Sequence, residues 1–376
     1  MDAAHSWHPG TDRIASIWPV PVPLLPDELI SSWLVRAALA QGCDPLALTG
    51  MVWPKWRAWT LDVDRVASED RLLALSAPSG IPTGAFQWST LQPTAQLVHG
   101  ADLLARATWP WILTLGARNT RRRGGLQYCP HCLAEDAHPH YRLHWRFAWH
   151  TGCEKHGVSL LDRCWNCGSP LEPHRLLATD RHAGQCATCK ADLGAAQAGR
   201  CHEDAMRFQQ EADCVVHEGR SRCLDRSVAT AEWFVLADFF VSLIRRTSRS
   251  RGIRLIDLMD RLGVQLPEDL PLVAGEGVER LHVGDRQRVL GAVWNLIRAG
   301  RGEFEVAVKA SGLSRQGLFG KGEAVPAVLA DLVEALPDHP SERTSTTKPH
   351  LMAPRPRHQV MRMMARLERL LKAMPK

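Results

Sequence analysis

Four pairs of potential metal ligands follow one another in the middle of this 376-residue chain. Three pairs are C-x-x-C and one is C-x-x-H, and the ligands are Cys129, Cys132, Cys153, His156, Cys164, Cys167, Cys186 and Cys189. Thiolates and imidazoles at this spacing are typical of structural zinc sites. Taken consecutively, they form one set of three cysteines and a histidine (CCCH) and one set of four cysteines (CCCC). We therefore expect two tetrahedral zinc ions, each with four protein ligands and no open position for water.

The spacing leaves the pairing of these ligands open. Consecutive pairing is the simplest arrangement, but an interleaved cross-brace uses the same residues. Three further histidines are close enough in sequence to substitute, namely His131, His150 and His174. A third site is a weaker alternative because no C-x-x-C pair anchors it, and its candidates are Cys201, Cys214, Cys223, His202 and His217. We interpret these cysteines, and Cys43, as packing or surface residues.

Composition indicates an ordinary water-soluble protein with room for two or three domains. Hydrophobic residues make up 45% and charged residues 23%. The longest apolar run, 233–244, contains Asp238 and is followed by two arginines, which predicts a buried helix rather than a membrane span. The first residues lack the basic-then-apolar order of a signal peptide. We expect a cytoplasmic protein whose 11 cysteines serve metal binding rather than disulfides.

Net charge and its distribution favour a polyanionic partner such as double-stranded DNA. The formal charge is +6, and two thiolate-bound zinc ions lower it to about +3. Basic residues flank and enter the cysteine region, and the candidate contacts there are Arg118, Arg121, Arg122, Arg123, Arg142 and Arg146. The alternative interpretation is that these side chains only form a solvated surface.

The first 115 residues predict an extended lead-in over 1–23 and a helical, helix-turn-helix-like domain over 24–115. Residues 25–42 have helical periodicity, with Asp27 and Glu28 favouring the first turn and Gly42 ending the helix. A second helix over 44–50 follows after a short turn. Residues 61–86 predict one more helix with a Pro/Gly turn.

The remainder predicts four further parts: a double zinc-binding module over 116–200, a helical region over 201–275, a second helix-turn-helix-like domain over 276–340, and a linker with an amphipathic tail helix over 341–376. In the second helix-turn-helix-like domain, Gly312 ends one helix and Ser314 caps the next, 314–319. A third helix follows at about 327–336. The segment resembles the helix-turn-helix domains of addiction-module regulators, which implies that Arg315, Gln316 and Lys321 meet DNA. The predicted fold class is mainly α with a small zinc-ribbon or zinc-knuckle module.

The string LQYCPHCLAEDAHPHYRLHWRFAWHTGCEKHGVSLLDRCWNCGSPL, residues 126–171, resembles the zinc region of the TniQ/TnsD family of transposon target-selection proteins. The family pattern places a YCPxCL-x-ED opening before Y-x-R-x-x-W and C-x-x-HG-x-x-LLD-x-C-x-x-CG. The positions that match are Tyr128, Cys129, Pro130, Cys132, Leu133, Glu135, Asp136, Tyr141, Arg142, Trp145, Cys153, His156, Gly157, Leu160, Leu161, Cys164, Cys167 and Gly168. Near the N-terminus, Ser32, Trp33 and Arg36 also match, so the resemblance covers about 18–195.

This resemblance implies a non-catalytic adaptor that marks the insertion site. Such proteins bind target DNA, or dock on a DNA-bound complex such as an RNA-guided effector, and recruit the transposon's AAA+ ATPase. Some members of the family form homodimers. The resemblance implies no membrane partner and no small-molecule substrate.

Three other functions are open at this point. A zinc-ribbon nuclease would use His144, His150 and Glu154, but we identify no convincing site for a catalytic cation among the scattered carboxylates. A transcription regulator would read operators through 303–340. An RNA-binding zinc protein is the weakest alternative, because the chain lacks stacking-platform strands and Arg-Gly repeats.

Overall fold

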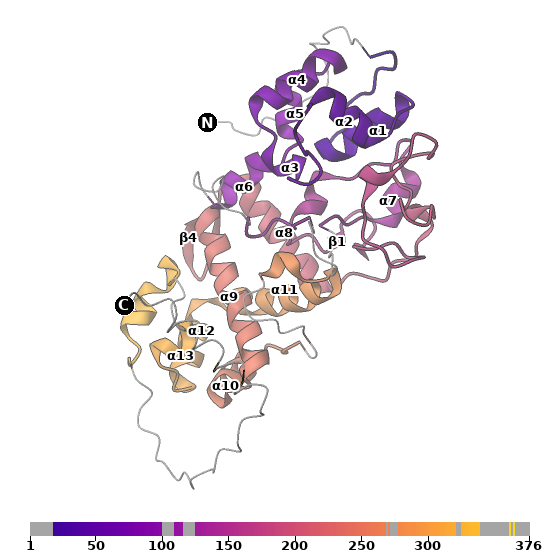
Figure 1. Ribbon diagram of the computed structural model, residues 1–376. Helices are drawn as coiled ribbons and strands as arrows, with labels where there is room; N and C mark the ends of the chain where they lie inside the picture. Colours follow the sequence, from indigo (N-terminus) through magenta and orange to yellow (C-terminus); the bar gives the residue numbers. More distant parts are fainter. Residues whose placement is uncertain are drawn as a thin grey trace. The chain divides into compact units, whose positions relative to one another are not determined.

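A computed structural model describes residues 18–99, 109–115, 125–267, 270, 277–320, 325–338, 361 and 364. The fold is mostly helical, as predicted, with two short antiparallel ribbons (Figure 1). The chain divides into two compact units, Met1–His339 and Pro340–Lys376. Within the described ranges, no helix combines the length and the apolar character that a membrane span requires.

Six helices form the N-terminal part of the first unit: α1 (Ile30–Ala40), α2 (Pro45–Val52), α3 (Val63–Val66), α4 (Glu69–Ser79), α5 (Thr83–Trp88) and α6 (Gln92–His99). Trp33 of α1 is fully buried and stacks on Trp18 of the lead-in. Gln41 exchanges hydrogen bonds with the backbone of Val20, which fastens the lead-in to α1. The helices predicted over 25–42 and 44–50 therefore exist, and they pack on each other.

Two details of this part differ from the sequence predictions. Residues 61–86 form three helices instead of one, because Ser68 and Pro82 adopt extended backbone and Gly80 ends α4. Asp27 and Glu28 precede α1 rather than forming its first turn, since Leu29 is the extended residue before the helix. Glu28 is buried there, where it accepts hydrogen bonds from Ser32 and Arg36.

The cysteine region contains little regular structure. Its elements are α7 (Pro130–Glu135), the 3-10 turns η2 (Leu143–Arg146), η3 (Pro173–Arg175) and η4 (Leu193–Ala195), and the ribbon β1 (Gly152–Cys153) with β2 (Val158–Ser159). In the ribbon, Gly152 pairs with Ser159 and Cys153 with Val158. Loops of this kind need an internal support, which metal ions provide in small modules.

Helices dominate the rest of the first unit: α8 (Glu203–Glu218), α9 (Thr230–Ser250), α10 (Ile253–Arg261), α11 (Val283–Arg298), α12 (Gly300–Ala310), α13 (Arg315–Phe319) and α14 (Ala330–Glu334). The remaining elements are the 3-10 turns η5 (Val278–Arg280) and η6 (Ala327–Leu329) and the hairpin of β3 (Arg220–Cys223) and β4 (Arg226–Ala229). α9 confirms the buried helix predicted over 233–244. Ser314 caps α13 as predicted, because its hydroxyl accepts a hydrogen bond from the amide of Gly317.

Helix α11 attaches these helices to the cysteine region. Arg286 is almost completely buried, and it donates hydrogen bonds to the carbonyl oxygens of Ala148 and His150 and to the side chain of Gln127. Burial lowers the pKa of Arg286 to about 10. Buried residues of both regions belong to one hydrophobic cluster. The predicted boundaries inside the first unit stay predictions.

The tail lies largely outside the described residues. Met361 and Met364 are the described residues of the predicted linker and tail helix over 341–376, and both are helical. The other residues of 341–376 lie outside the described part of the chain.

Candidate metal centres and nucleic-acid interface

The eight predicted ligands come together in two groups of four, Cys129–Cys132–Cys153–His156 and Cys164–Cys167–Cys186–Cys189. In each group the ligand atoms all lie within 4.8 Å of one another. The pairing is therefore consecutive, and the interleaved cross-brace is wrong. Each group can hold one metal ion.

Distances in both groups suit a tetrahedral ion with thiolate ligands. Sulfur atoms around a tetrahedral zinc with bonds of about 2.3 Å lie about 3.7 Å apart. The separation is 3.6 Å between Cys132 and Cys153, 3.6 Å between Cys164 and Cys189, and 3.7 Å between Cys167 and Cys186. The Nδ1 atom of His156 lies 3.3 Å from the sulfurs of Cys129 and Cys153. These spacings fit zinc, with Nδ1 as the histidine ligand atom.

Tight turns aim backbone amides at the sulfurs. The amide of Gly157 donates to the carbonyl of Cys153, and the amide of Gly168 donates in the same way to Cys164. Both glycines have left-handed φ values, 65° and 67°, which glycine adopts without strain. The Cys164 sulfur accepts hydrogen bonds from the amides of Asn166 and Cys167. Such turns stabilise the thiolate form that binds a metal.

The first pair is held by a short helix that begins with a proline. Pro130 is the first residue of α7, so Cys129 precedes the helix and Cys132 lies in its first turn. Proline suits this position because the first helical amide needs no partner. Secondary structure therefore fixes the distance between these two ligands.

Glu135 orients His156, a role that sequence spacing did not identify. Its Oε1 atom lies 3.0 Å from Nε2 of His156, and its Oε2 atom accepts a hydrogen bond from Lys155 at 2.5 Å. A carboxylate on the distal nitrogen fixes the imidazole so that the other nitrogen faces the metal. Glu135 belongs to the ED of the family pattern, which is the signal that would have identified it.

Ser169 supports the second group. Hydrogen bonds from its hydroxyl and amide lower the pKa of Cys167 to about 6, which favours the thiolate at neutral pH. Cys167 is exposed and Cys164 is buried, so this centre lies at the protein surface. Trp165, between them, is half exposed and donates its indole N–H to the carbonyl of Asp192.

The spare histidines have other contacts. His150 hydrogen-bonds Asp213, His174 stacks on Trp59, and His131 is exposed. The candidates for a third site do not form a cluster of three or more ligands in the described ranges. Cys223 is buried, Cys214 is exposed beside Glu218, and Cys201 lines a surface pocket.

Arg146 is fully buried, so the prediction that it contacts DNA or a partner is wrong. Its guanidinium group lies 2.6 Å from Asp62 and 2.7 Å from Asp64 and also donates to the carbonyl of Leu113. Asp62 precedes α3 and Asp64 lies within it, so this ion pair joins the cysteine region to the N-terminal helices. Burial still raises the pKa of Asp64 to about 6, despite the arginine.

The other predicted contacts differ in accessibility. Arg142 is partly buried, forms a bidentate pair with Asp136 and stacks on Trp145. Arg315 and Gln316 are exposed on α13. The remaining predicted contacts, Arg118, Arg121, Arg122, Arg123 and Lys321, lie outside the described residues.

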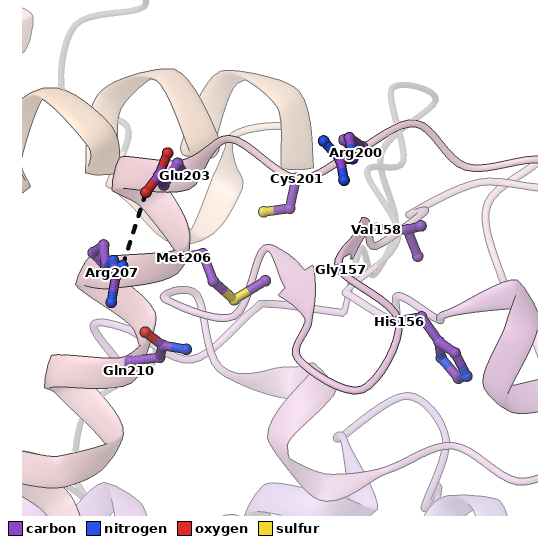
Figure 2. A pocket seen from close by; sticks show the side chains of 9 residues that line it. All are labelled: His156, Gly157, Val158, Arg200, Cys201, Glu203, Met206, Arg207 and Gln210. Atoms are coloured by element: carbon purple, nitrogen blue, oxygen red, sulfur yellow. Dashed lines mark ion pairs between the residues drawn. The ribbon is translucent and has the colours of Figure 1, made fainter.

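A surface pocket of about 500 Å³ adjoins the first centre (Figure 2). Its nine lining residues are His156, Gly157, Val158, Arg200, Cys201, Glu203, Met206, Arg207 and Gln210. Arg207 lies 3.8 Å from Glu203, the single carboxylate of the lining. The lining combines apolar side chains, such as Val158 and Met206, with charged and polar ones.

The three residues considered for a nuclease line a second cavity of about 320 Å³. His144 is paired with Asp27, and His150 with Asp213, while Glu154 also lines the cavity. The carboxylate of Asp27 raises the pKa of His144 in spite of its burial. In the described part of the chain, these groups do not form a cluster that can hold a metal ion.

Comparison with known families supports the resemblance seen in the sequence. The sequence model of the TniQ family matches residues 19–160, which confirms the resemblance for this part of the chain. The match includes the N-terminal helices and the complete CCCH group, whereas the CCCC group follows it. A search of curated proteins found no match.

Proposed function

We propose that this chain, whose residues 19–160 carry the TniQ match, is a non-catalytic adaptor of transposition that selects the insertion target. The observation that carries the proposal is the coincidence of this match with a complete CCCH group inside it. The adaptor binds double-stranded DNA, or docks on a DNA-bound complex such as an RNA-guided effector, and recruits the transposon's AAA+ ATPase. It acts in the cytoplasm, with self-association into a homodimer as a further property.

Zinc would serve the fold rather than the reaction. Four protein ligands at each centre leave no position for an activated water. When bound, the ions would hold the loops between α7 and η4 in a fixed shape. Glu135 would keep His156 oriented, and Ser169 would favour the thiolate form of Cys167.

The two helix-turn-helix-like segments would provide recognition surfaces. α13 presents Arg315 and Gln316 to solvent, and these side chain types pair with guanine and adenine edges in the major groove. α2 presents Leu46 and Met51 instead, both more than half exposed. That apolar face favours a protein partner for the N-terminal segment.

Capture of sheared genomic DNA by the zinc-loaded protein tests target reading. Enrichment of one locus or one repeated motif at physiological salt would support direct recognition. Association with the transposon ATPase would separate the adaptor from a stand-alone transcription regulator, which has no such partner. Nicking of a plasmid in the presence of Mg²⁺ or Mn²⁺ would overturn the non-catalytic assignment.

A further inference from the structure

Resting on the proposed function, we infer that the corner between α9 and α10 is a duplex-DNA-binding surface, in which Arg249 and Arg251 contact phosphates and Ile253 contacts the groove between them. Neither the family match nor the predicted contacts include this corner.

Charge within the segment 245–254 is one-sided. The ten residues 245–254, RRTSRSRGIR, contain five arginines and no carboxylate. Arg249 and Arg251 are exposed. The nearest acidic group along α10, Asp257, is already paired with Arg261 at 2.8 Å. Exposed arginines in such a setting are suited to phosphates, which the planar guanidinium group binds through two hydrogen bonds.

The backbone holds these side chains at a rigid corner. α9 ends at Ser250, Arg251 adopts a left-handed conformation at φ 45°, and α10 begins at Ile253. The amide of Arg251 donates a hydrogen bond to the carbonyl of Thr247, and the amide of Leu255 donates one to the carbonyl of Gly252. Both helices bury one face in the protein, so the turn between them is held in place on either side.

Ile253, between these arginines, is unusually exposed for an apolar residue. Its side chain is 86% exposed, more than any other large hydrophobic side chain in the described residues. An isolated apolar side chain between arginines gains nothing in water, but in a DNA groove it can pack against sugars or wedge at a base step. This combination of cations and one apolar contact favours DNA over an acidic protein surface.

The same corner supports the second helix-turn-helix-like segment. Arg254 donates to the carbonyl of Gly312, in the turn between α12 and α13, at 2.8 Å. Arg246 donates to the carbonyl of Leu318 near the end of α13. Phosphate contacts at the corner would therefore fix the position of α13, whose exposed Arg315 and Gln316 would then meet bases.

Fluorescence anisotropy with a fluorescein-labelled duplex of about 30 base pairs, measured from about 50 to about 300 mM NaCl, tests the inference. The double variant Arg249→Gln/Arg251→Asn removes both cations, and asparagine tolerates the left-handed backbone. We expect the slope of log K against log [NaCl] to fall in magnitude by about 2, and affinity at about 0.1 M salt to fall by more than about tenfold. Ile253→Ala should weaken binding with little change in slope, because it removes no charge.

Arg261→Gln is the matched control. It removes one arginine from the far end of α10, but that arginine is paired with Asp257, so its loss should change slope and affinity little. Circular dichroism and zinc content should be the same for all variants. Double-variant binding equal to that of the wild type would overturn the inference while leaving the adaptor function intact. The inference would also be overturned if the wild-type protein bound the ATPase but no duplex at any salt concentration. If the wild-type protein bound neither the ATPase nor a duplex, the proposed function would be overturned as well.

Discussion

Glu135 determines the orientation of the one imidazole ligand in the first centre. We expect Glu135→Gln to lower zinc affinity of the CCCH group by about 10- to 100-fold, because the distal nitrogen of His156 loses its carboxylate. Chelator competition, with zinc release followed by a colorimetric indicator, measures the effect. Lys155→Gln removes only the exposed partner of Glu135 and is the control. Equal affinity of wild type and Glu135→Gln would contradict the orienting role.

Arg146 has a structural role that spacing alone concealed. Arg146→Met leaves Asp62 and Asp64 without their buried cation, which should lower the free energy of unfolding by about 3–5 kcal/mol. Urea denaturation measures this. Arg142→Met is the control. It removes a nearby arginine that is only partly buried, and it should lower the free energy of unfolding by less. If the Arg146→Met protein were as stable as the wild type but bound DNA more weakly, the structural role would be contradicted and a role in binding supported.

Glu28 makes stability depend on pH. Burial raises the pKa of this carboxyl from 4.5 to about 7, although Arg36 opposes the shift. The folded state therefore binds the proton more tightly, and the contribution of Glu28 to the free energy of unfolding falls as pH rises from about 4.5 to about 7.

Glu28→Gln removes this dependence. The melting temperature of the variant minus that of the wild type should shift in favour of the variant as pH rises from about 5.5 to about 8. Comparing the two proteins at each pH cancels the titration of other groups. A difference that stays constant, or shifts in the opposite direction, would show that Arg36 compensates fully for the burial.

At the scale of elements, the sequence predicted the helices and ligand groups whose formation depends on neighbouring residues in the chain. Ligand spacing gave both metal groups, helical periodicity gave α1, α2 and α9, and Ser314 gave the cap of α13. The predicted Pro/Gly turn of 61–86 is present at Gly80 and Pro82, but the separate short helix α3 was missed. Its Asp64 pairs with Arg146, which lies 82 residues away. Contacts of this kind have no local sequence signal.

The first metal centre lies within the main hydrophobic cluster, and this has a testable consequence. Cys132→Ser removes a buried ligand and should abolish zinc binding at this centre and unfold or aggregate the protein. Cys167→Ser affects an exposed ligand and should release the second zinc with less global damage. Zinc stoichiometry and thermal denaturation distinguish the two. A soluble Cys132→Ser protein with both ions bound would contradict the ligand set.

At the scale of the whole molecule, the cysteine region connects to several other parts of the chain. Arg146 joins it to the N-terminal helices, and Arg286 and Asp213 join it to α11 and α8. These long-range polar contacts explain why the predicted zinc module does not stand apart in the fold. Net charge predicted a polyanionic partner, but it did not indicate which arginines are accessible, since Arg146 and Arg286 are buried.

The proposed function requires that the protein connect DNA to the transposon's ATPase. Co-sedimentation of the purified ATPase with a target duplex, with and without the zinc-loaded protein, tests it most directly. We predict that the protein increases the fraction of ATPase on DNA and that Cys132→Ser does not. An ATPase that neither binds the protein nor changes its occupancy of DNA in its presence would contradict the account.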